Sequence, residues 1–413
     1  MNKYRIETFG CKLNERDSRE YEEVLSRFLN PSEEKEGADL ILINSCGVVE
    51  RAERNIIKRA REHKERGRTV VITGCLPSIT NEDLKNTADE VVRIGDLSEL
   101  SRALSRLTKR EPQEKSDIKK ETSLVSGFIA ISKGCLGNCS YCATKLSRGK
   151  LKSKEQKKIL HEVEELLSRG CKEIHLTSQD LAIYGLDRGK QELPQLLQEI
   201  LNREDDFRLK LGMTNPFHTK RILGELLDIF KDERVYKYLH VPVQSGSNEM
   251  LKKMRRGHAA EDFQEIVQKV YGSFSDFLMA TDIIVGFPGE GEEEFQKTYE
   301  LIEKVRPHIV NITRFSPRPG TEATKMNDKC PEDTKKERSR TLNHLTKRIR
   351  LEQNAKLQGG RFKILVSEKG KKGTQIARLP SYRALIVKRG FPGEIRQATV
   401  TGYEYNYLKG ELL

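Results

Sequence analysis

The sequence of 413 residues lacks the features of a membrane or secreted protein. It has no N-terminal secretory leader and no apolar run of about 18 residues, the length that a transmembrane helix needs. Tryptophan is absent, and eight cysteines without a leader do not indicate a disulfide framework in a chain of this size. Because free thiols persist in a reducing compartment, we expect a cytoplasmic protein with no membrane partner.

The length and the charge of the chain predict several domains and an anionic partner. A chain of this length is too long for one hydrophobic core and predicts two or three domains. The formal net charge is +13, and from Pro331 onward 19 Lys and Arg stand against 8 Asp and Glu, so +11 of the total lies in the last fifth of the chain. This excess favours RNA as a partner of the C-terminal end, with a merely solvated basic face as the alternative.

The most informative motif is a C-x3-C-x2-C run formed by Cys135, Cys139 and Cys142, which follows a predicted apolar strand. Three thiolates on one short loop can bind three irons of a 4Fe-4S cube and leave the fourth iron without a protein ligand. Structural zinc is the alternative, but it needs four ligands and usually a second pair at close spacing, which the loop lacks. We therefore favour an iron-sulfur site with one open iron.

Three other cysteines follow predicted strands in the first 110 residues, where short apolar runs alternate with charged amphipathic stretches. The predicted strands are 4–9, 39–43 and 69–73, and the predicted helices are 15–29, 49–66 and a segment that begins at 81–85. This alternation predicts an α/β domain with a parallel sheet. Cys11, Cys46 and Cys75 come one to three residues after the strands, so they should meet at one edge of the sheet. We expect a second three-cysteine cluster there.

The middle of the chain predicts an incomplete barrel. Six strand candidates lie at 128–132, 173–177, 208–213, 238–243, 277–285 and 309–315. Helical patterns between them lie at 156–169, 193–202, 220–230, 260–273 and 293–305. A full eight-stranded barrel takes about 250 residues, so this shorter stretch supports a partial (β/α)6 barrel.

Polar, turn-forming residues follow several of these strands, at the edge where barrel enzymes place their active residues. They include Thr177 to Asp180 and Gln244 with Ser245, and Asp282 lies near the end of the fifth strand. The run 286–289 contains two glycines, but it lacks the Lys-Ser/Thr of a P-loop and the three-glycine dinucleotide spacing. Binding of a nucleoside triphosphate is therefore disfavoured.

The C-terminal region predicts a helix followed by a small β-barrel of the OB type. Residues 331–360 have apolar residues at near-helical spacing, and strands are expected at 362–366, 383–387 and 394–403 with a continuation. Tyr403, Tyr405 and Tyr407 alternate onto one strand face, and we expect most of them to pack in the barrel core. The basic side chains expected to bind RNA phosphates are Lys363, Lys371, Lys372, Arg378, Arg383, Lys388 and Arg389.

The cluster loop resembles that of the radical S-adenosylmethionine (SAM) enzymes, because the aromatic Tyr141 stands directly before Cys142. In that family SAM binds the open iron and is cleaved to a 5'-deoxyadenosyl radical, which assigns Cys135, Cys139 and Cys142 to catalysis. Arg256, in a stretch that also matches the family, binds a carboxylate or phosphate, or else forms a surface ion pair. The resemblance implies that SAM is bound by Tyr141, Thr177, Ser178, Gln179, Asp180, Gln244, Ser245, Arg256 and Asp282.

The stretches Thr8–Ser18, Asn44–Cys46 and Gly74–Cys75 resemble the amino-terminal domain of methylthiotransferases, a branch of the radical SAM enzymes. In that family a second 4Fe-4S cluster also has an open iron, which carries the sulfur that is donated. The segment 361–413 resembles the TRAM domain, an RNA-binding module. These resemblances imply four parts: residues 1–112, a radical SAM barrel at 113–330, a linker helix at 331–360 and a TRAM domain at 361–413.

The resemblance implies a tRNA methylthiotransferase with two 4Fe-4S clusters and SAM as cofactors. The expected reaction adds a methylthio group to C2 of N6-threonylcarbamoyladenosine at position 37, in the anticodon stem-loop, with an electron-donor protein as partner and no DNA. Two related substrates stay open, namely N6-isopentenyladenosine in tRNA and an aspartate of a ribosomal protein. A radical enzyme without sulfur insertion and a noncatalytic, metal-stabilised RNA-binding protein are the remaining alternatives.

Overall fold

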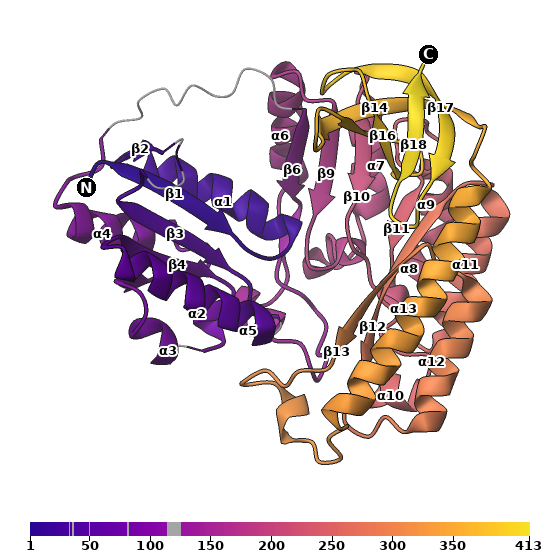
Figure 1. Ribbon diagram of the computed structural model, residues 1–413, viewed down its shortest axis with the longest axis horizontal. Helices are drawn as coiled ribbons and strands as arrows, with labels where there is room; N and C mark the ends of the chain where they lie inside the picture. Colours follow the sequence, from indigo (N-terminus) through magenta and orange to yellow (C-terminus); the bar gives the residue numbers. More distant parts are fainter. Residues whose placement is uncertain (33, 35–36, 49, 81, 114–124) are drawn as a thin grey trace. The chain divides into compact units, whose positions relative to one another are not determined.

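The computed structural model describes the chain except for residues 33, 35–36, 49, 81 and 114–124 (Figure 1). The chain divides into two compact units that are formed from discontinuous segments. Unit 1 comprises Met1–Glu121, Lys133–Leu151 and Ser316–Lys325, and unit 2 comprises Thr122–Ser132, Lys152–Phe315 and Met326–Leu413. The loop with Cys135, Cys139 and Cys142 therefore belongs to the same unit as the N-terminal sheet.

A five-stranded parallel sheet forms the N-terminal part of unit 1. In spatial order its strands are β2 (Asn30–Pro31), β1 (Lys3–Thr8), β3 (Leu40–Ser45), β4 (Thr69–Gly74) and β5 (Glu90–Val91). The helices around it are α1 (Lys12–Leu25), α2 (Glu50–Glu65), η1 (Leu76–Ser78), α3 (Glu82–Lys85) and α4 (Leu97–Thr108). The predicted strands and helices are confirmed, apart from Val49 and Asn81, which lie outside the described residues.

Strand β3 lies in the middle of this sheet and is buried along its whole length. Leu40 and Leu42 point to one face and share a core cluster with Tyr21 of α1. Ile41 and Ile43 point to the other face and belong to a second cluster. A strand that is apolar on both faces needs helices on both sides of the sheet. The sheet is therefore covered on both faces, and only its edges and strand ends remain for a site.

Six parallel strands form the partial barrel of unit 2. In chain order they are β6 (Ser126–Ala130), β9 (Glu173–Thr177), β10 (Arg208–Leu211), β11 (Tyr238–His240), β12 (Leu278–Val285) and β13 (Ile309–Arg314). Neighbours along the chain pair in parallel, and a bridge between Met213 and His240 joins the two three-stranded halves. Two short strands, β7 (Ser132–Lys133) and β8 (Lys152–Ser153), lie outside this series. The predicted (β/α)6 barrel is thus confirmed.

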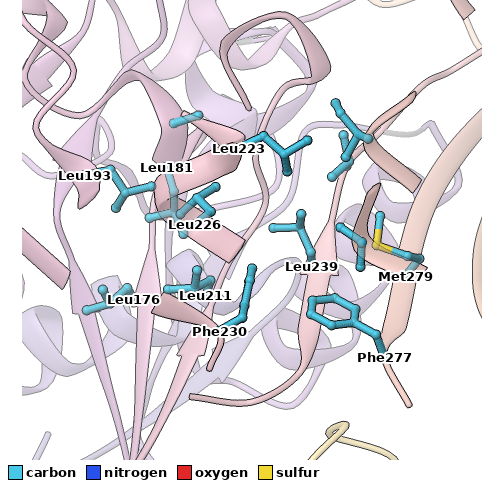
Figure 2. Packing of buried hydrophobic residues seen from close by; sticks show 14 of the residues in the cluster. Leu176, Leu181, Leu193, Leu211, Leu223, Leu226, Phe230, Leu239, Phe277 and Met279 are labelled. Atoms are coloured by element: carbon cyan, nitrogen blue, oxygen red, sulfur yellow. The ribbon is translucent and has the colours of Figure 1, made fainter. Parts of the chain in front are cut away.

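Helices cover the outside of the barrel strands and form the largest hydrophobic core with them. These helices are η2 (Leu181–Ile183), η3 (Leu186–Arg188), α6 (Gln156–Ser168), α7 (Leu193–Leu201), α8 (Pro216–Arg221), α9 (Leu223–Ile229), α10 (Asn248–Lys253), α11 (Ala260–Ser273) and α12 (Glu292–Val305). Figure 2 shows Leu176 and Leu211 of neighbouring strands close to Leu226 of α9 and Phe230. The helix predicted at 220–230 is broken into α8 and α9, because Ile222 leaves helical backbone geometry.

The C-terminal part of unit 2 is the helix α13 (Glu332–Ala355) followed by a closed five-stranded barrel (Figure 1). Around the barrel the strands are β14 (Arg361–Lys369), β15 (Gln375–Arg378), β16 (Ala384–Val387), β18 (Leu408–Leu412) and β17 (Ile395–Tyr403). The core includes Ile364, Val366, Leu385 and Leu408. This confirms the expected OB-like barrel, although β15 was not predicted because its short sequence is polar at both ends.

A loop of the small barrel packs against the first residues of the (β/α)6 strands. The Tyr382 ring contacts the rings of Tyr236 and Tyr238, with centroids 4.9 Å and 5.4 Å apart. Arg383 forms an ion pair with Asp276 just before β12. These contacts lie at the amino ends of the strands, at the end of the barrel opposite to the predicted site.

Within the described ranges, no helix combines the length and the apolar character required to cross a membrane. The longest of them, α13, carries charged side chains along most of its length.

Candidate functional site

Cys11, Cys46 and Cys75 each follow the carboxyl end of a strand in the unit 1 sheet. Cys11 lies between β1 and α1, Cys46 directly follows β3, and Cys75 directly follows β4. Strands β1, β3 and β4 are neighbours and run parallel, so their ends lie side by side. The approach is close: a Cβ added to Gly10 would lie 3.1 Å from the Cys46 Cβ, and one added to Gly47 would lie 3.3 Å from the Cys75 carbonyl carbon. The structure thus brings the three segments together as the sequence predicts.

Asn14 ties these strand ends to each other. Its side-chain amide donates to the carbonyl of Ser45 at 3.0 Å, and the same carbonyl accepts from the backbone N–H of Cys75 at 2.9 Å. The Asn14 carboxamide oxygen lies 3.7 Å from the Cys11 sulfur and accepts from Arg148 at 2.9 Å. Asn14 itself is buried, whereas Cys11 at the edge of this network is exposed. The positions of the cysteine segments are therefore fixed by hydrogen bonds as well as by the sheet.

The three thiols are within electrostatic reach of one another. Burial raises the pKa of the Cys46 thiol, and the neighbouring Cys75 and Cys11 raise it further. Burial also raises the pKa of Cys75, and Arg148 opposes that rise. Thiols of this kind stay protonated unless a cation compensates the charge of their thiolates. The donor set is therefore suited to a metal cluster, which supplies that compensation.

The other cysteine set, formed by Cys135, Cys139 and Cys142, lies on the loop that precedes α5 (Thr144–Arg148). The N–H of Gly137 donates to the Cys135 sulfur at 3.2 Å, and the N–H of Cys142 donates to the Cys139 carbonyl at 3.1 Å. A Cβ added to Gly137 would lie 3.3 Å from the Cys135 sulfur and 3.7 Å from the Cys139 sulfur. The backbone at Gly137 therefore lies close to two of the thiols, and a larger residue there would press on the Cys135 sulfur.

All six of these cysteines belong to unit 1. In the described part of the chain, no three His, Cys, Asp or Glu side chains are placed to hold a single metal ion. A three-cysteine cluster site has another geometry, because each thiolate binds a different iron of the cube and the sulfurs stand apart. The remaining cysteines are Cys171, which is buried before β9, and Cys330, which lies in a loop of unit 2.

Two arginines that the sequence did not single out lie near the N-terminal cysteines. Arg148, at the end of α5, and Arg318 both lie in unit 1, and their side chains are 4% and 3% exposed. Arg148 pairs with Asp17 of α1, and Arg318 pairs with Glu53 of α2. Sequence reasoning had no signal for them, because arginine is common and neither lies within a motif used to locate the site.

The edge of unit 2 that was predicted to bind SAM contains two buried acceptors without a donor. Among the described residues, the side-chain carbonyl oxygens of Gln179 and Gln244 have no hydrogen-bond partner. Gln244 also has φ +78°, a left-handed conformation that costs a non-glycine residue energy and is concentrated at functional sites. Two unpaired acceptors suit a ligand that brings its own N–H donors, such as the ammonium group of SAM.

Asp180 is the buried carboxylate of this edge. It accepts hydrogen bonds from the backbone N–H groups of Ala182 and Asn215, both at 3.0 Å. Burial raises its pKa to about 6, despite these hydrogen bonds. The hydroxyls of Thr177, Ser178 and Ser245 take part in local hydrogen bonds at the strand ends.

Two further predicted residues of unit 2, Asp282 and Arg256, are held by protein groups. Asp282 accepts from His240 and from Asn311, each at 2.8 Å, and although burial raises its pKa, His240 brings it below the usual value. Arg256 donates to the carbonyl of Pro242 at 2.8 Å. Arg256 is partly buried, and the choice between a ligand contact and an ion pair stays open. His240 and Asn311 were not predicted.

The small barrel exposes most of its predicted RNA-binding side chains. Lys363, Lys371, Lys372, Lys388 and Arg389 are exposed, and we call these five the TRAM basic set. Arg383 does not belong with them: it is 6% exposed and paired with Asp276, so it serves the packing of unit 2. Arg378 is partly buried, paired with Glu368 and stacked over the Tyr382 ring.

The expected burial of the three C-terminal tyrosines is wrong. Tyr403, Tyr405 and Tyr407 are 37%, 39% and 37% exposed. Alternation placed them on one strand face, but that face points to solvent near the β17–β18 turn, and the core is filled by Val400 and Leu408 instead. Exposed rings beside basic residues are available for stacking on bases.

Three family models match consecutive parts of the chain. The radical SAM superfamily matches residues 129–302, the uncharacterized protein family UPF0004 matches residues 3–95, and the TRAM domain matches residues 355–413.

Curated relatives match the chain over nearly its full length. A probable threonylcarbamoyladenosine tRNA methylthiotransferase of Archaeoglobus fulgidus is 42% identical over 98% of both chains, and one of Pyrococcus horikoshii is 39% identical over the whole of both. A tRNA-2-methylthio-N(6)-dimethylallyladenosine synthase of Carboxydothermus hydrogenoformans is 31% identical over 99% of both.

Among solved structures, the radical SAM methyltransferase TsrM of Kitasatospora setae is similar in fold. The TM-score is 0.52 at 16% identity, and the match covers 76% of this chain and 66% of that one. At this identity the likeness describes the fold alone, and it agrees with the (β/α)6 barrel described above.

Proposed function

Because the chain belongs to the tRNA methylthiotransferases of the radical SAM superfamily, we propose that it adds a methylthio group to C2 of N6-threonylcarbamoyladenosine at position 37 of tRNA. The observation that carries this proposal is the pairing of two three-cysteine sets within unit 1, in a chain whose similarity to threonylcarbamoyladenosine enzymes extends from end to end. A protein that only binds RNA would not need an iron without a protein ligand in either cluster.

The proposed cofactors are two 4Fe-4S clusters and SAM. Cys135, Cys139 and Cys142 would hold the cluster at which SAM binds, and Cys11, Cys46 and Cys75 would hold the second one. When bound, these groups supply a carbon-centred radical for hydrogen abstraction and a sulfur atom for transfer. The chain's own residues would bind and orient them. Asn14 fixes the N-terminal cysteine segments, and the side-chain oxygens of Gln179 and Gln244, which have no partner among the described residues, would accept from a ligand with N–H groups.

The substrate would be held through its phosphates and its unpaired bases. The TRAM basic set supplies positive charge for the backbone of an anticodon stem-loop, and the exposed tyrosines supply faces for stacking. An electron-donor protein and a cytoplasmic location are part of the proposal, since radical formation needs a reductant and thiolate clusters need a reducing compartment.

The test is mass spectrometry of tRNA nucleosides after reaction of the reconstituted protein with two tRNAs, one carrying N6-threonylcarbamoyladenosine and the other N6-isopentenyladenosine. We expect the methylthio product from the first tRNA only. Cys46→Ala should keep SAM cleavage and lose the product, whereas the matched control Cys330→Ala should keep both. Product formed by Cys46→Ala would remove the sulfur-donating role of the N-terminal set.

The same experiment separates the alternatives. Product from the isopentenyl substrate alone would assign the chain to the other tRNA branch, and modification of ribosomal protein with no tRNA product would assign it to the protein-directed relatives. The +11 excess at the C-terminal end argues against the latter. Tight binding of zinc with no cleavage of SAM would support the noncatalytic RNA-binding protein.

A further inference from the structure

Two buried arginines lie near the N-terminal cysteine set, although both come from much later segments of the chain. Arg148 ends α5, a short helix that packs against η1 directly after Cys75. Arg318 lies in the segment Ser316–Lys325, which follows the last strand of the barrel in sequence. Both segments belong to unit 1, so their contacts with the N-terminal sheet lie within one compact body.

Arg148 is positioned by two groups of α1. It donates to the Asp17 carboxylate at 2.8 Å and to the Asn14 carboxamide oxygen at 2.9 Å, and that same oxygen lies 3.7 Å from the Cys11 sulfur. The helix that Arg148 ends, α5, also packs against η1, which begins directly after Cys75. A single buried cation is therefore directed toward two of the three cysteines.

Arg318 lies beside the helix that follows the third cysteine, Cys46. Its guanidinium lies 2.6 Å from the Glu53 carboxylate, in the first turn of the helix that follows Cys46. Among the described residues the Arg318 Nε has no hydrogen-bond partner, although the side chain is 3% exposed. A buried, unpaired donor of this kind is costly unless a ligand or anion accepts from it.

The charges at this site explain what the arginines do. If a cube binds here, three thiolates and its sulfides would give a net negative site, and a reducing electron would add to that charge. Cys11 is exposed, but Cys46 is half-buried and Cys75 is buried, and at buried positions a negative charge is opposed by burial and stabilised by a fixed guanidinium nearby. Asp17 and Glu53 hold the two cations in place and keep the empty site neutral enough to fold.

We propose that Arg148 and Arg318 are positioning residues that form a cationic clamp around the second cluster, so that its reduced form would be stabilised. This inference rests on the proposed function, because it needs a cluster on Cys11, Cys46 and Cys75. The clamp also explains why α5 and the segment Ser316–Lys325 belong to unit 1, since each delivers one cation to the N-terminal sheet.

The experiment measures the reduction potential of the second cluster by itself. The full-length chain carrying Cys135→Ala, Cys139→Ala and Cys142→Ala is reconstituted with iron and sulfide, titrated with reductant and followed by electron paramagnetic resonance. Into this background are placed Arg148→Gln, Arg318→Gln, the charge-keeping Arg148→Lys and the control Arg59→Gln. Arg59 is a suitable control because it pairs with Glu7 in the same sheet domain but is 45% exposed.

Loss of either guanidinium should lower the ratio of reduced to oxidised cluster about tenfold at a fixed applied potential. For one electron this corresponds to a reduction potential that is lower by about 59 mV. Arg59→Gln and Arg148→Lys should leave the potential unchanged. An unchanged potential in both Gln variants, with iron retained, would overturn the clamp. If Arg148→Gln loses its iron, the Arg148→Lys variant decides between charge and shape. A wild-type potential in Arg148→Lys would support the clamp. Loss of iron from Arg148→Lys as well would overturn it, because the shape of the side chain and not its charge would then be what matters. Absence of iron from the background chain itself would instead refute the proposed function.

Discussion

Replacing Glu173 with Gln removes a buried carboxylate from the amino end of the barrel in unit 2. Glu173 is 3% exposed and accepts three hydrogen bonds, from Ser126 at 2.7 Å and from His175 and Tyr236 at 2.8 Å. An ionised carboxylate only accepts, so all three partners donate to it. A glutamine would present its amide N–H₂ to at least one of these donors, and a buried donor facing another donor is unsatisfied.

The magnitude follows from the pKa of Glu173. Burial by itself raises this pKa, but the hydrogen bond and charge of His175, with Ser126 and Tyr236, outweigh burial and lower it from 4.5 to about 2. Each unit is worth about 1.4 kcal/mol, so ionised Glu173 contributes about 3 kcal/mol to folding. Because the folded pKa is depressed, this contribution is present above pH 4.5 and is lost as the pH falls toward 2.

The assay is urea unfolding of the iron-free chain followed by circular dichroism at neutral pH. We expect Glu173→Gln to lower the free energy of unfolding of unit 2 by about 3 kcal/mol. Glu249→Gln is the matched control, because Glu249 pairs with Lys253 on an exposed helix surface, and its midpoint should not move. A change below about 0.5 kcal/mol in Glu173→Gln would refute the reasoning.

Three further predictions concern the binding of ligands. Because burial raises the pKa of Asp180 to about 6, its carboxylate is charged at pH 8 and protonated near pH 5. Asp180→Asn should therefore weaken SAM binding about tenfold at pH 8 and little at pH 5, as measured by equilibrium dialysis. Equal losses of affinity at both pH values would contradict this. Changing the TRAM basic set to Gln should flatten the slope of log Kd against log salt for tRNA by about 0.7 to 0.9 per lost phosphate contact, whereas Arg383→Gln should lower stability and leave that slope unchanged. Tyr405→Ala should weaken tRNA binding by about 1 kcal/mol without changing the slope of log Kd against log salt, because a stacked ring carries no charge. A changed slope would contradict stacking and indicate an indirect effect on the neighbouring Lys347.

The fold could be predicted from sequence because its elements follow local rules. Strand β9 and helix α11 have the predicted bounds, since an apolar run or a 3.6-residue periodicity is a property of the segment itself. The edge position of Cys11, Cys46 and Cys75 could also be predicted, because parallel strands present the same end to the same edge. The failures were short elements such as β15, whose pairing depends on a closed barrel.

The roles of single side chains were harder to predict, because they depend on contacts between distant segments. Arg383 was grouped with the surface lysines by its charge, but Asp276, more than a hundred residues earlier, holds it in the interior. Arg148 was overlooked for the same reason: only the fold places α5 beside Cys75. The exposed tyrosines show a related limit, since alternation places them on one face without saying which face is inside.

The association of Cys135, Cys139 and Cys142 with the N-terminal sheet has a consequence for stability. These cysteines are separated from that sheet by the segment around residues 114–124 but belong to the same compact unit. Assembly of either cluster should therefore stabilise both segments, because a metal bound only to the folded state adds its binding energy to folding.

The most direct test of two three-cysteine clusters is iron analysis after anaerobic reconstitution of three chains. The wild type should hold about eight irons, and the chains with either Cys11, Cys46 and Cys75 or Cys135, Cys139 and Cys142 changed to Ala should each hold about four. Four irons in the wild type, with none left in the chain that lacks Cys135, Cys139 and Cys142, would contradict the second cluster and the sulfur chemistry that depends on it.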